Sequence, residues 1–298
     1  MIIYAATLAR AGPRLLPAML IALCTVWPAC GDPLKIVAAE SVYGDIARQI
    51  GGSDVMVTSV FVSPNQDPHE FEPSASTARA IADARLVIYN GADYDPWAAK
   101  LLGASKTAAS REVIEVARLV HKKAGDNPHF WYEAAAMSAL ASTLVAKMSE
   151  IDAVHRNGYA ERGEAFATAM APLQDRIAAL RKKHAGTPVT ATEPVFDYMA
   201  QALGLRMRNG RFQLAVMNGT EPGAAAIAAF EKDLRTRAVK VLLYNTQTTQ
   251  ALAERMRTIA KEAGLPVVSI TETAPPGQSY QAWMLAQLDE LDRALGTR

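Results

Sequence analysis

Two histidines follow prolines in segments that neither a helix nor a sheet would accommodate, and imidazole is the commonest metal ligand among side chains. His69 lies in segment 63–74, which contains three prolines and follows the β-rich run 55–62. His129 lies in segment 126–131, again directly after a proline and ahead of an expected helix. Proline stiffens the backbone, so a histidine held there loses little entropy on binding. The two loops predict one metal site assembled from distant parts of the chain.

Two glutamates occupy comparable positions in the second half of the chain. Glu193 follows a strand expected at 188–192, and Glu272 follows one expected at 266–270. Two carboxylates and two neutral imidazoles balance a divalent cation, which avoids the cost of burying an unpaired ion. Imidazole suits zinc and iron while carboxylate suits manganese, so this mixture accepts several metals. Simpler interpretations remain open: Glu193 could favour a helix N-terminus, and Glu272 could be an exposed loop acid.

Strand-like and helix-like segments alternate along the chain, which predicts an α/β fold with parallel sheets and right-handed crossovers. The strands are expected at 35–39, 55–62, 86–89, 113–116, 188–192, 239–244 and 266–270. Segment 212–218 is expected to be irregular. Ligands bind beyond the carboxyl ends of the strands in such sheets, and all four candidate ligands follow a strand.

A long helix is predicted between the two groups of strands. Residues 157–184 carry apolar side chains at helical spacing and, at 1.5 Å per residue, would span roughly 40 Å. We therefore expect two (βα) lobes, each with a mostly parallel sheet, joined by one rigid helix. The expected divisions are a signal peptide at 1–31, an N-terminal lobe at 33–155, the linking helix at 156–185 and a C-terminal lobe at 186–298. If the lobes face each other, the four ligands meet in one cleft.

The N-terminus has the layout of a secretory signal peptide. Two arginines precede a short apolar run at 15–26, and Ala29, Cys30 and Gly31 follow. This predicts export to the periplasm with cleavage after Gly31. The alternative is cleavage before Cys30 with a lipid on its thiol, which the Trp-Pro-Ala lead-in disfavours. Because the only two cysteines are Cys24 and Cys30, the mature chain has neither a disulfide nor a cysteine zinc site.

Composition excludes some other functions. The chain has 298 residues, of which 50% are hydrophobic and 20% charged, with a net charge of +1. That length supports a packed core and two domains. The chain has no excess of basic residues of the kind that indicates a nucleic-acid partner.

At these motifs the chain resembles the metal-binding solute receptors of bacterial ABC importers, a family that includes zinc and manganese receptors and streptococcal adhesin lipoproteins. Segments 67–74 and 127–131 resemble the first two ligand loops of the family. Segment 192–198 resembles the third, where members carry His or Glu, and 271–273 falls where an acidic fourth ligand is found. The resemblance covers about residues 35–296.

The resemblance implies that His69, His129, Glu193 and Glu272 bind Zn²⁺ or Mn²⁺ as a transported ligand. It also implies a monomer that works with an ABC permease in the inner membrane and catalyses no reaction. Two departures leave the metal open: segment 118–126 lacks the His- and acid-rich insertion of zinc-dedicated members, and 132–134 replaces their usual Asp-Pro.

Two rival functions are considered beside transport. An exported zinc-dependent hydrolase keeps three protein ligands and an open water position, but the chain has no His-Glu-x-x-His motif. A metal-binding adhesin would need a host-binding surface, which no segment encodes. Of the other histidines, His121 is interpreted as a surface residue, His155 as a solvated residue and His184 as a residue at a helix C-terminus. Hydrogen-bond partners for the ligands are expected among Asp67, Tyr89, Asn90 and Asn245.

Overall fold

The computed structural model describes residues 1–2, 32–65, 70–105 and 110–296. The chain divides into two compact units, Met1–Asp32 and Pro33–Arg298, and all helices and strands below belong to the second. The expected signal peptide, with Cys24 and Cys30, falls almost wholly outside the described residues. His69 and Asp67 fall outside them as well.

The N-terminal sheet contains four parallel strands in the order β2-β1-β3-β4. They are β1 (Leu34–Glu40), β2 (Val55–Phe61), β3 (Leu86–Tyr89) and β4 (Glu112–Glu115). The alternating helices are α1 (Ser41–Gly51), α2 (Ala75–Asp83), α3 (Pro96–Ala104) and α4 (Val116–Leu119), with the short η1 (Gly52–Asp54). Six of the seven residues of the central strand β1 are buried, as expected for a parallel strand covered on both faces.

The C-terminal sheet repeats this plan in the order β6-β5-β7-β8, again fully parallel. Its strands are β5 (Pro188–Ala191), β6 (Arg206–Arg208), β7 (Leu242–Asn245) and β8 (Val267–Ile270). Its helices are η6 (Pro194–Phe196), α7 (Asp197–Ala202), α8 (Gly210–Met217), α9 (Ala224–Arg235), α10 (Ala251–Glu262) and α11 (Tyr280–Gly296). The α/β class with two parallel sheets is confirmed.

Two elements of this lobe differ from the sequence expectation. The segment expected to be irregular is helix α8, which buries Phe212 and Val216 one turn apart. Strand β6 was not expected, because its three residues Arg-Met-Arg lack an apolar run. Both errors arise where a short element takes its shape from its neighbours rather than from a local pattern.

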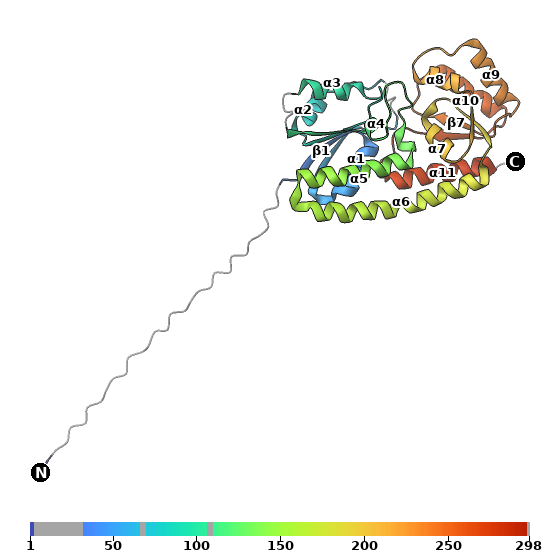
Figure 1. The fold of residues 1–298 in the computed structure, drawn as a ribbon. Helices are drawn as coiled ribbons and strands as arrows, with labels where there is room; N and C mark the ends of the chain where they lie inside the picture. The colour runs from blue at the N-terminus through green and yellow to red at the C-terminus, as the bar shows by residue number, and fades with distance from the viewer. Residues whose placement is uncertain (3–31, 66–69, 106–109, 297–298) are drawn as a thin grey trace. The chain divides into compact units, whose positions relative to one another are not determined.

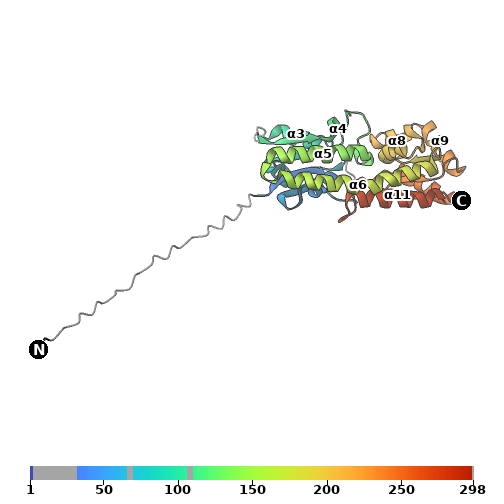
Figure 2. The same ribbon diagram turned by 60° about the horizontal axis from the view of Figure 1, so that its bottom comes forward.

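Two long helices connect the sheets, α5 (Ala134–Ile151) and α6 (Arg156–His184), with η4 (Phe130–Tyr132) and η5 (Ala153–His155) beside them. The 29-residue α6 runs along both sheets, with α5 against its first part and α11 against its second (Figure 1; Figure 2). Pro172 lies inside α6 and removes one backbone hydrogen bond there. The expected linking helix is thus present.

One hydrophobic cluster extends across both sheets, and each sheet also packs against a smaller cluster of its own. A single cluster of buried residues includes Ile36 and Ile88 from the first sheet and Val189 and Leu243 from the second. The C-terminal helix also reaches back across the lobes, because the backbone N–H of Tyr280 donates to Asp45 of α1 at 2.8 Å. The lobe boundaries at 155 and 186 therefore stay a prediction, since the packing runs through them. Among the described residues, no helix combines the length and hydrophobicity of a membrane span.

Asp292 of α11 is the main charged contact that fastens this helix to α6. Its carboxylate accepts hydrogen bonds from Lys183 and His184 at 2.7 Å and from Arg176 at 3.1 Å. Burial alone would raise the pKa of Asp292, but these hydrogen bonds outweigh it and lower the pKa to about 2. A depressed carboxyl pKa contributes stability above the unfolded value, and this contribution is lost as pH falls toward 2.

Replacing Asp292 with asparagine should therefore lower the free energy of unfolding by about 1–2 kcal/mol at neutral pH, after allowance for solvent screening. Urea unfolding of both chains at pH 7, 5 and 3 measures the difference, which should shrink only below about pH 4. Asp289→Asn is the matched control, because Asp289 is 53% exposed and contacts only one of these cations. A penalty that stays constant down to pH 3 would contradict this account.

Candidate metal centre

Three neighbouring strands of the C-terminal sheet end at one edge and present polar side chains there. Glu193 lies two residues beyond β5, Asn245 is the last residue of β7, and Glu272 lies two residues beyond β8. Because β7 lies between β5 and β8, Asn245 stands between the two glutamates. Its side-chain nitrogen donates to Glu272 Oε1 at 2.8 Å and to Glu193 Oε2 at 3.2 Å. The structure thus brings the two predicted carboxylates together around one amide.

His129 belongs to the N-terminal half of the chain, in the segment that connects α4 to η4, and it is fully buried. Its Nδ1 lies 2.6 Å from Asn127 Oδ1, which also accepts the backbone N–H of His129 at 3.1 Å. Asn127 Nδ2 donates to the carbonyl oxygen of Pro194 at 2.7 Å, so the amide orientation is fixed. An amide oxygen can only accept, so Nδ1 donates to it, and in the neutral tautomer with this proton the lone pair is at Nε2. That lone pair is what a metal ligand requires.

The Nε2 atom of His129 lies 3.3 Å from Glu272 Oε2. A lone pair that faces a carboxylate oxygen is repulsive unless a cation or a proton lies nearby. The side chains of His129 and Glu272 are 0% and 1% exposed, so water does little to screen this contact. The pair is therefore suited to a positive ion.

Tyr94, from the loop before α3, completes the surroundings of Glu272. Its hydroxyl donates to Glu272 Oε2 at 2.9 Å and so links the N-terminal lobe to a predicted ligand in the C-terminal lobe. Burial and the Glu272 carboxylate raise the pKa of Tyr94, so the phenol keeps its proton and remains a donor. The rings of Tyr94 and Trp131 pack edge-on against the imidazole of His129, with centroids 6.0 and 5.4 Å away.

His69, the fourth predicted ligand, lies outside the described residues. The residues on either side of it contact the loop that follows β7: Ser63 accepts a hydrogen bond from Gln247 and Glu70 one from Thr249, both at 3.5 Å. Among the residues that are described, no three His, Cys, Asp or Glu side chains form a metal cage by themselves. His129 pairs directly with Glu272, and Glu193 joins them through Asn245.

The other sequence candidates have structural contacts. Tyr89 donates to Glu115 rather than to Glu193 or Glu272. Asn90 donates to the Pro128 carbonyl and so supports the loop before His129. His184 pairs with Asp292 near the helix end, as expected. His155 is partly exposed, with 33% of its side-chain surface accessible, and its Nδ1 also lies 2.7 Å from Asp152 Oδ2, a partner that the sequence did not indicate.

Three residues of the site were not singled out from the sequence: Tyr94, Asn127 and Gln247. Asn127 could have been found, since an Asn two residues before a candidate ligand can hydrogen-bond the backbone N–H of that ligand. Gln247 bonds the backbone of Glu272 across two strands, and Tyr94 reaches Glu272 across the lobes. Such contacts between distant residues leave no local signal.

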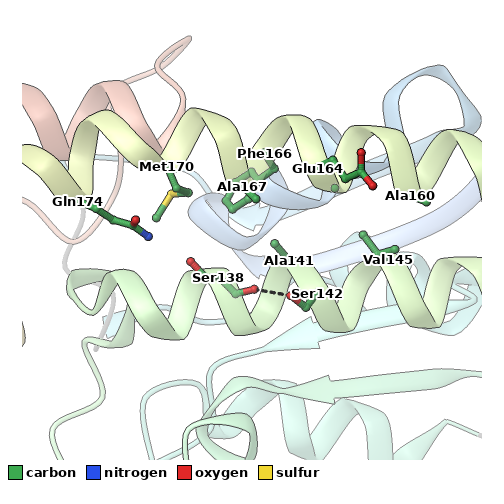
Figure 3. Close-up of a pocket in the computed structure, with 11 residues that line it drawn as sticks. Ser138, Ala141, Ser142, Val145, Ala160, Glu164, Phe166, Ala167, Met170 and Gln174 are labelled. Carbon is green, nitrogen blue, oxygen red and sulfur yellow. Dashed lines mark hydrogen bonds between the residues drawn. The ribbon is translucent and has the colours of Figure 1, made fainter.

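Two cavities differ in their relation to this site. One of about 350 Å³ is lined by Asp93, Tyr94, Asp126 and Pro128, and so reaches the side chains next to His129 and Glu272. Another of about 700 Å³ lies between α5 and α6 (Figure 3). Its lining is mostly small or apolar, including Ala141, Phe166 and Met170, with Glu164 as its one carboxylate, so it does not suit a metal.

Two parallel α/β lobes along a long helix, with an imidazole and two carboxylates buried where they meet, define a class of extracytoplasmic solute-binding proteins. A family model described as zinc-uptake complex component A, periplasmic, matches residues 36–294, and the chain therefore belongs to this family.

Individual relatives agree with this assignment. The metal ABC transporter substrate-binding lipoprotein SloC of Streptococcus mutans is 23% identical over 294 residues, covering 91% of this chain and 93% of the relative. The manganese ABC transporter substrate-binding lipoprotein PsaA of Streptococcus mitis is 24% identical, covering 90% and 91%. The periplasmic zinc-binding protein TroA from Treponema pallidum has the same fold, with a TM-score of 0.75 at 15% identity over 88% and 99% of the two chains.

Proposed function

We propose that this protein captures a divalent transition metal, zinc or manganese, between its two lobes outside the cytoplasm and delivers it to an ABC permease. The observation that carries the proposal is the buried pair of His129 Nε2 and Glu272 Oε2, 3.3 Å apart, with Glu193 held beside it by Asn245. A divalent cation would relieve the repulsion among these groups. Relatives named as metal and manganese ABC substrate-binding proteins support the same function.

The proposed ligands are His69, His129, Glu193 and Glu272. Two carboxylates balance the charge of the ion, and two imidazoles complete four donors. For His69 the support is indirect: its loop starts and ends beside Gln247 and Thr249, which follow β7 at the edge where the glutamates lie. Asp93 and Asp126 line the adjacent cavity, where their carboxylates would attract an approaching cation.

Calorimetric titration of the metal-free protein with zinc and with manganese tests this function. We expect one ion per chain and tighter binding of zinc, in keeping with the usual affinity order of divalent metals. Ligands must be deprotonated, so zinc affinity should fall by roughly tenfold or more between pH 7.5 and pH 5.5. A chain that binds neither metal at pH 7.5 would refute the proposal, and ester or peptide hydrolysis by the zinc-loaded protein would favour an enzyme instead. The relatives reported above are substrate-binding proteins, not enzymes.

The placement in the cell follows the family, whose description is periplasmic. We infer that a signal peptide exports the chain and that it acts there as a monomer beside an inner-membrane permease. The relatives SloC and PsaA are named lipoproteins, which supports lipid attachment at Cys30 over the release that the sequence favoured. Palmitate labelling of the wild-type and Cys30→Ser chains would distinguish a lipid-anchored protein from a released one. Light scattering would test whether the protein is a monomer.

A further inference from the structure

We propose that Asn127 is a positioning residue that holds two of the proposed metal ligands, His129 and Glu193, in a fixed relation to each other. Its side-chain oxygen fixes the imidazole of His129, and its side-chain nitrogen fixes the backbone next to Glu193. The two ligands lie on opposite sides of α5 and α6 in the sequence. The inference rests on the proposed function, since it assigns a role within the same site.

The partners of the Asn127 amide decide its orientation. Its Oδ1 lies 2.6 Å from His129 Nδ1 and accepts the backbone N–H of His129 at 3.1 Å. Its Nδ2 donates to the Pro194 carbonyl oxygen at 2.7 Å. A carbonyl oxygen can only accept, so the amide cannot be turned over without losing these bonds. An amide suits both partners because it combines an acceptor with a donor, whereas an ionised aspartate of the same shape has acceptors alone.

The Pro194 carbonyl is a stiff point of attachment for Glu193. Pro194 is buried and begins η6, and its carbonyl also accepts the backbone N–H of Asp197. The proline ring fixes its own φ and restricts the preceding residue to extended backbone. Glu193 has this conformation, with φ −144° and ψ 160°. The Glu193 side chain therefore starts from a backbone position that Asn127 ties to the loop of His129.

Two tyrosines attach the same loop to the C-terminal half at other points. The Tyr198 hydroxyl donates to the Asn127 carbonyl, and the Tyr132 hydroxyl donates to the carbonyl of Thr271, directly before Glu272, both at 2.7 Å. The loop that carries the proposed imidazole ligand is therefore attached beside both carboxylates. The Asn127 side chain adds a contact with the imidazole itself.

The coordination distances of a metal ion explain why this tie should matter. Zinc binds imidazole nitrogen at about 2.0–2.1 Å and carboxylate oxygen at about 2.0–2.2 Å, so its donors must keep set positions relative to one another. A group that supports a single ligand is typically worth about 10–100-fold in affinity. Because Asn127 holds one ligand by its ring and another by its backbone, its removal should disturb both donors.

The test begins with Asn127→Ala in the metal-free full chain. Calorimetric titration should give a zinc dissociation constant about 10–100-fold above that of the wild type. Proton NMR of the metal-free protein gives a second measurement. The wild type should show a slowly exchanging Nδ1 proton, assigned to His129 by its absence from His129→Ala, and Asn127→Ala should lose this signal with its acceptor. Wild-type zinc affinity in Asn127→Ala, or a retained Nδ1 signal, would overturn the inference.

Zinc titrations in two further backgrounds determine whether Asn127 acts on both ligands. Asn127→Ala is combined with His129→Ala and, separately, with Glu193→Ala. Substitutions at coupled sites are not additive, so in each background the effect of Asn127→Ala should be at least about threefold smaller than in the wild type without disappearing. A disappearance in either background would mean that Asn127 serves one ligand alone. An unchanged effect in either would mean that Asn127 does not act through the ligand removed. Each of these results would overturn the inference.

Tyr198→Phe is the matched control, because it removes a hydrogen bond to the Asn127 carbonyl but leaves the Asn127 amide in place. It should keep the zinc dissociation constant within about threefold of the wild type and retain the Nδ1 signal. An equal loss of affinity from Tyr198→Phe and Asn127→Ala would assign the effect to the lobe contact in general and overturn the inference.

If Asn127→Ala does not fold, Asn127→Ser replaces it, since a hydroxyl on so short a side chain cannot reach both partners, and the same results are expected. A wild-type chain that binds no metal would instead remove the proposed function. The Nδ1 signal of the metal-free protein would still report the contact between Asn127 and His129, so the two failures can be distinguished.

Discussion

Replacing His129 with alanine should raise the dissociation constant for zinc by more than about 100-fold, beyond the loss expected for groups that only support a ligand. The ring is fully buried, and the bond from Nδ1 to Asn127 leaves Nε2 as the one nitrogen able to ligate. Among the described histidines, His129 alone lies within ion-pair distance of Glu272, so none of the others is placed to replace it. Calorimetry of the metal-free variant and of the wild-type protein measures the change.

His155→Ala provides the control for this experiment. His155 also contacts a carboxylate, Asp152, at 2.7 Å, but between α5 and α6, where no proposed ligand is found. Its removal should leave zinc affinity within about twofold of the wild type, as expected for a group outside the ligand shells. If His129→Ala retained wild-type affinity while folding normally, His129 would not be a ligand, and the site would have to be sought elsewhere.

Truncating Tyr132 to alanine should cost about 3–5 kcal/mol of stability, the range for large aromatic side chains removed from a core. The ring is fully buried and packs against Phe196 and Trp283, with centroids 5.1 and 5.8 Å away. Its hydroxyl donates to the Thr271 carbonyl at 2.7 Å. All of these partners belong to the C-terminal half, whereas Tyr132 precedes α5, so the residue joins the two lobes. Urea unfolding followed by circular dichroism gives the loss.

Tyr132→Phe separates the hydroxyl from the ring. It should cost only about 1–2 kcal/mol, the usual range for losing a buried hydrogen bond. Tyr89→Phe is the control, because the half-buried Tyr89 hydroxyl donates to Glu115 within the N-terminal lobe. A loss below about 1 kcal/mol for Tyr132→Ala would mean that the lobes do not depend on this residue for their contact.

Local patterns were sufficient to predict the strand-end positions of Glu193 and Glu272. Short apolar runs before each residue marked the strands, and parallel pairing then places their carboxyl ends at one edge. The same reasoning marked Asn245 as a candidate partner, and the structure places it between the two glutamates. What the sequence could not supply was the donor geometry, since hydrogen bonds among three separate strands depend on their register.

Tyr94 shows where local patterns fail. It follows Gly91, Ala92 and Asp93, all with positive φ, a conformation that the sequence suggests only at the glycine. This sharp turn carries the Tyr94 hydroxyl to Glu272, 178 residues away in the chain. The contact of α11 with α1 was missed for the same reason: it depends on how the finished lobes pack.

The insertion of Phe130–Tyr132 into the C-terminal half bears on how the molecule could be divided. Phe130 contacts Tyr198, and Tyr132 contacts Phe196 and Trp283, although all three partners follow the long helix α6. If the chain were cut within α6, these aromatic rings would lose the side chains that bury them. Neither fragment would then contain a complete hydrophobic core, so the two lobes are not expected to fold independently of each other.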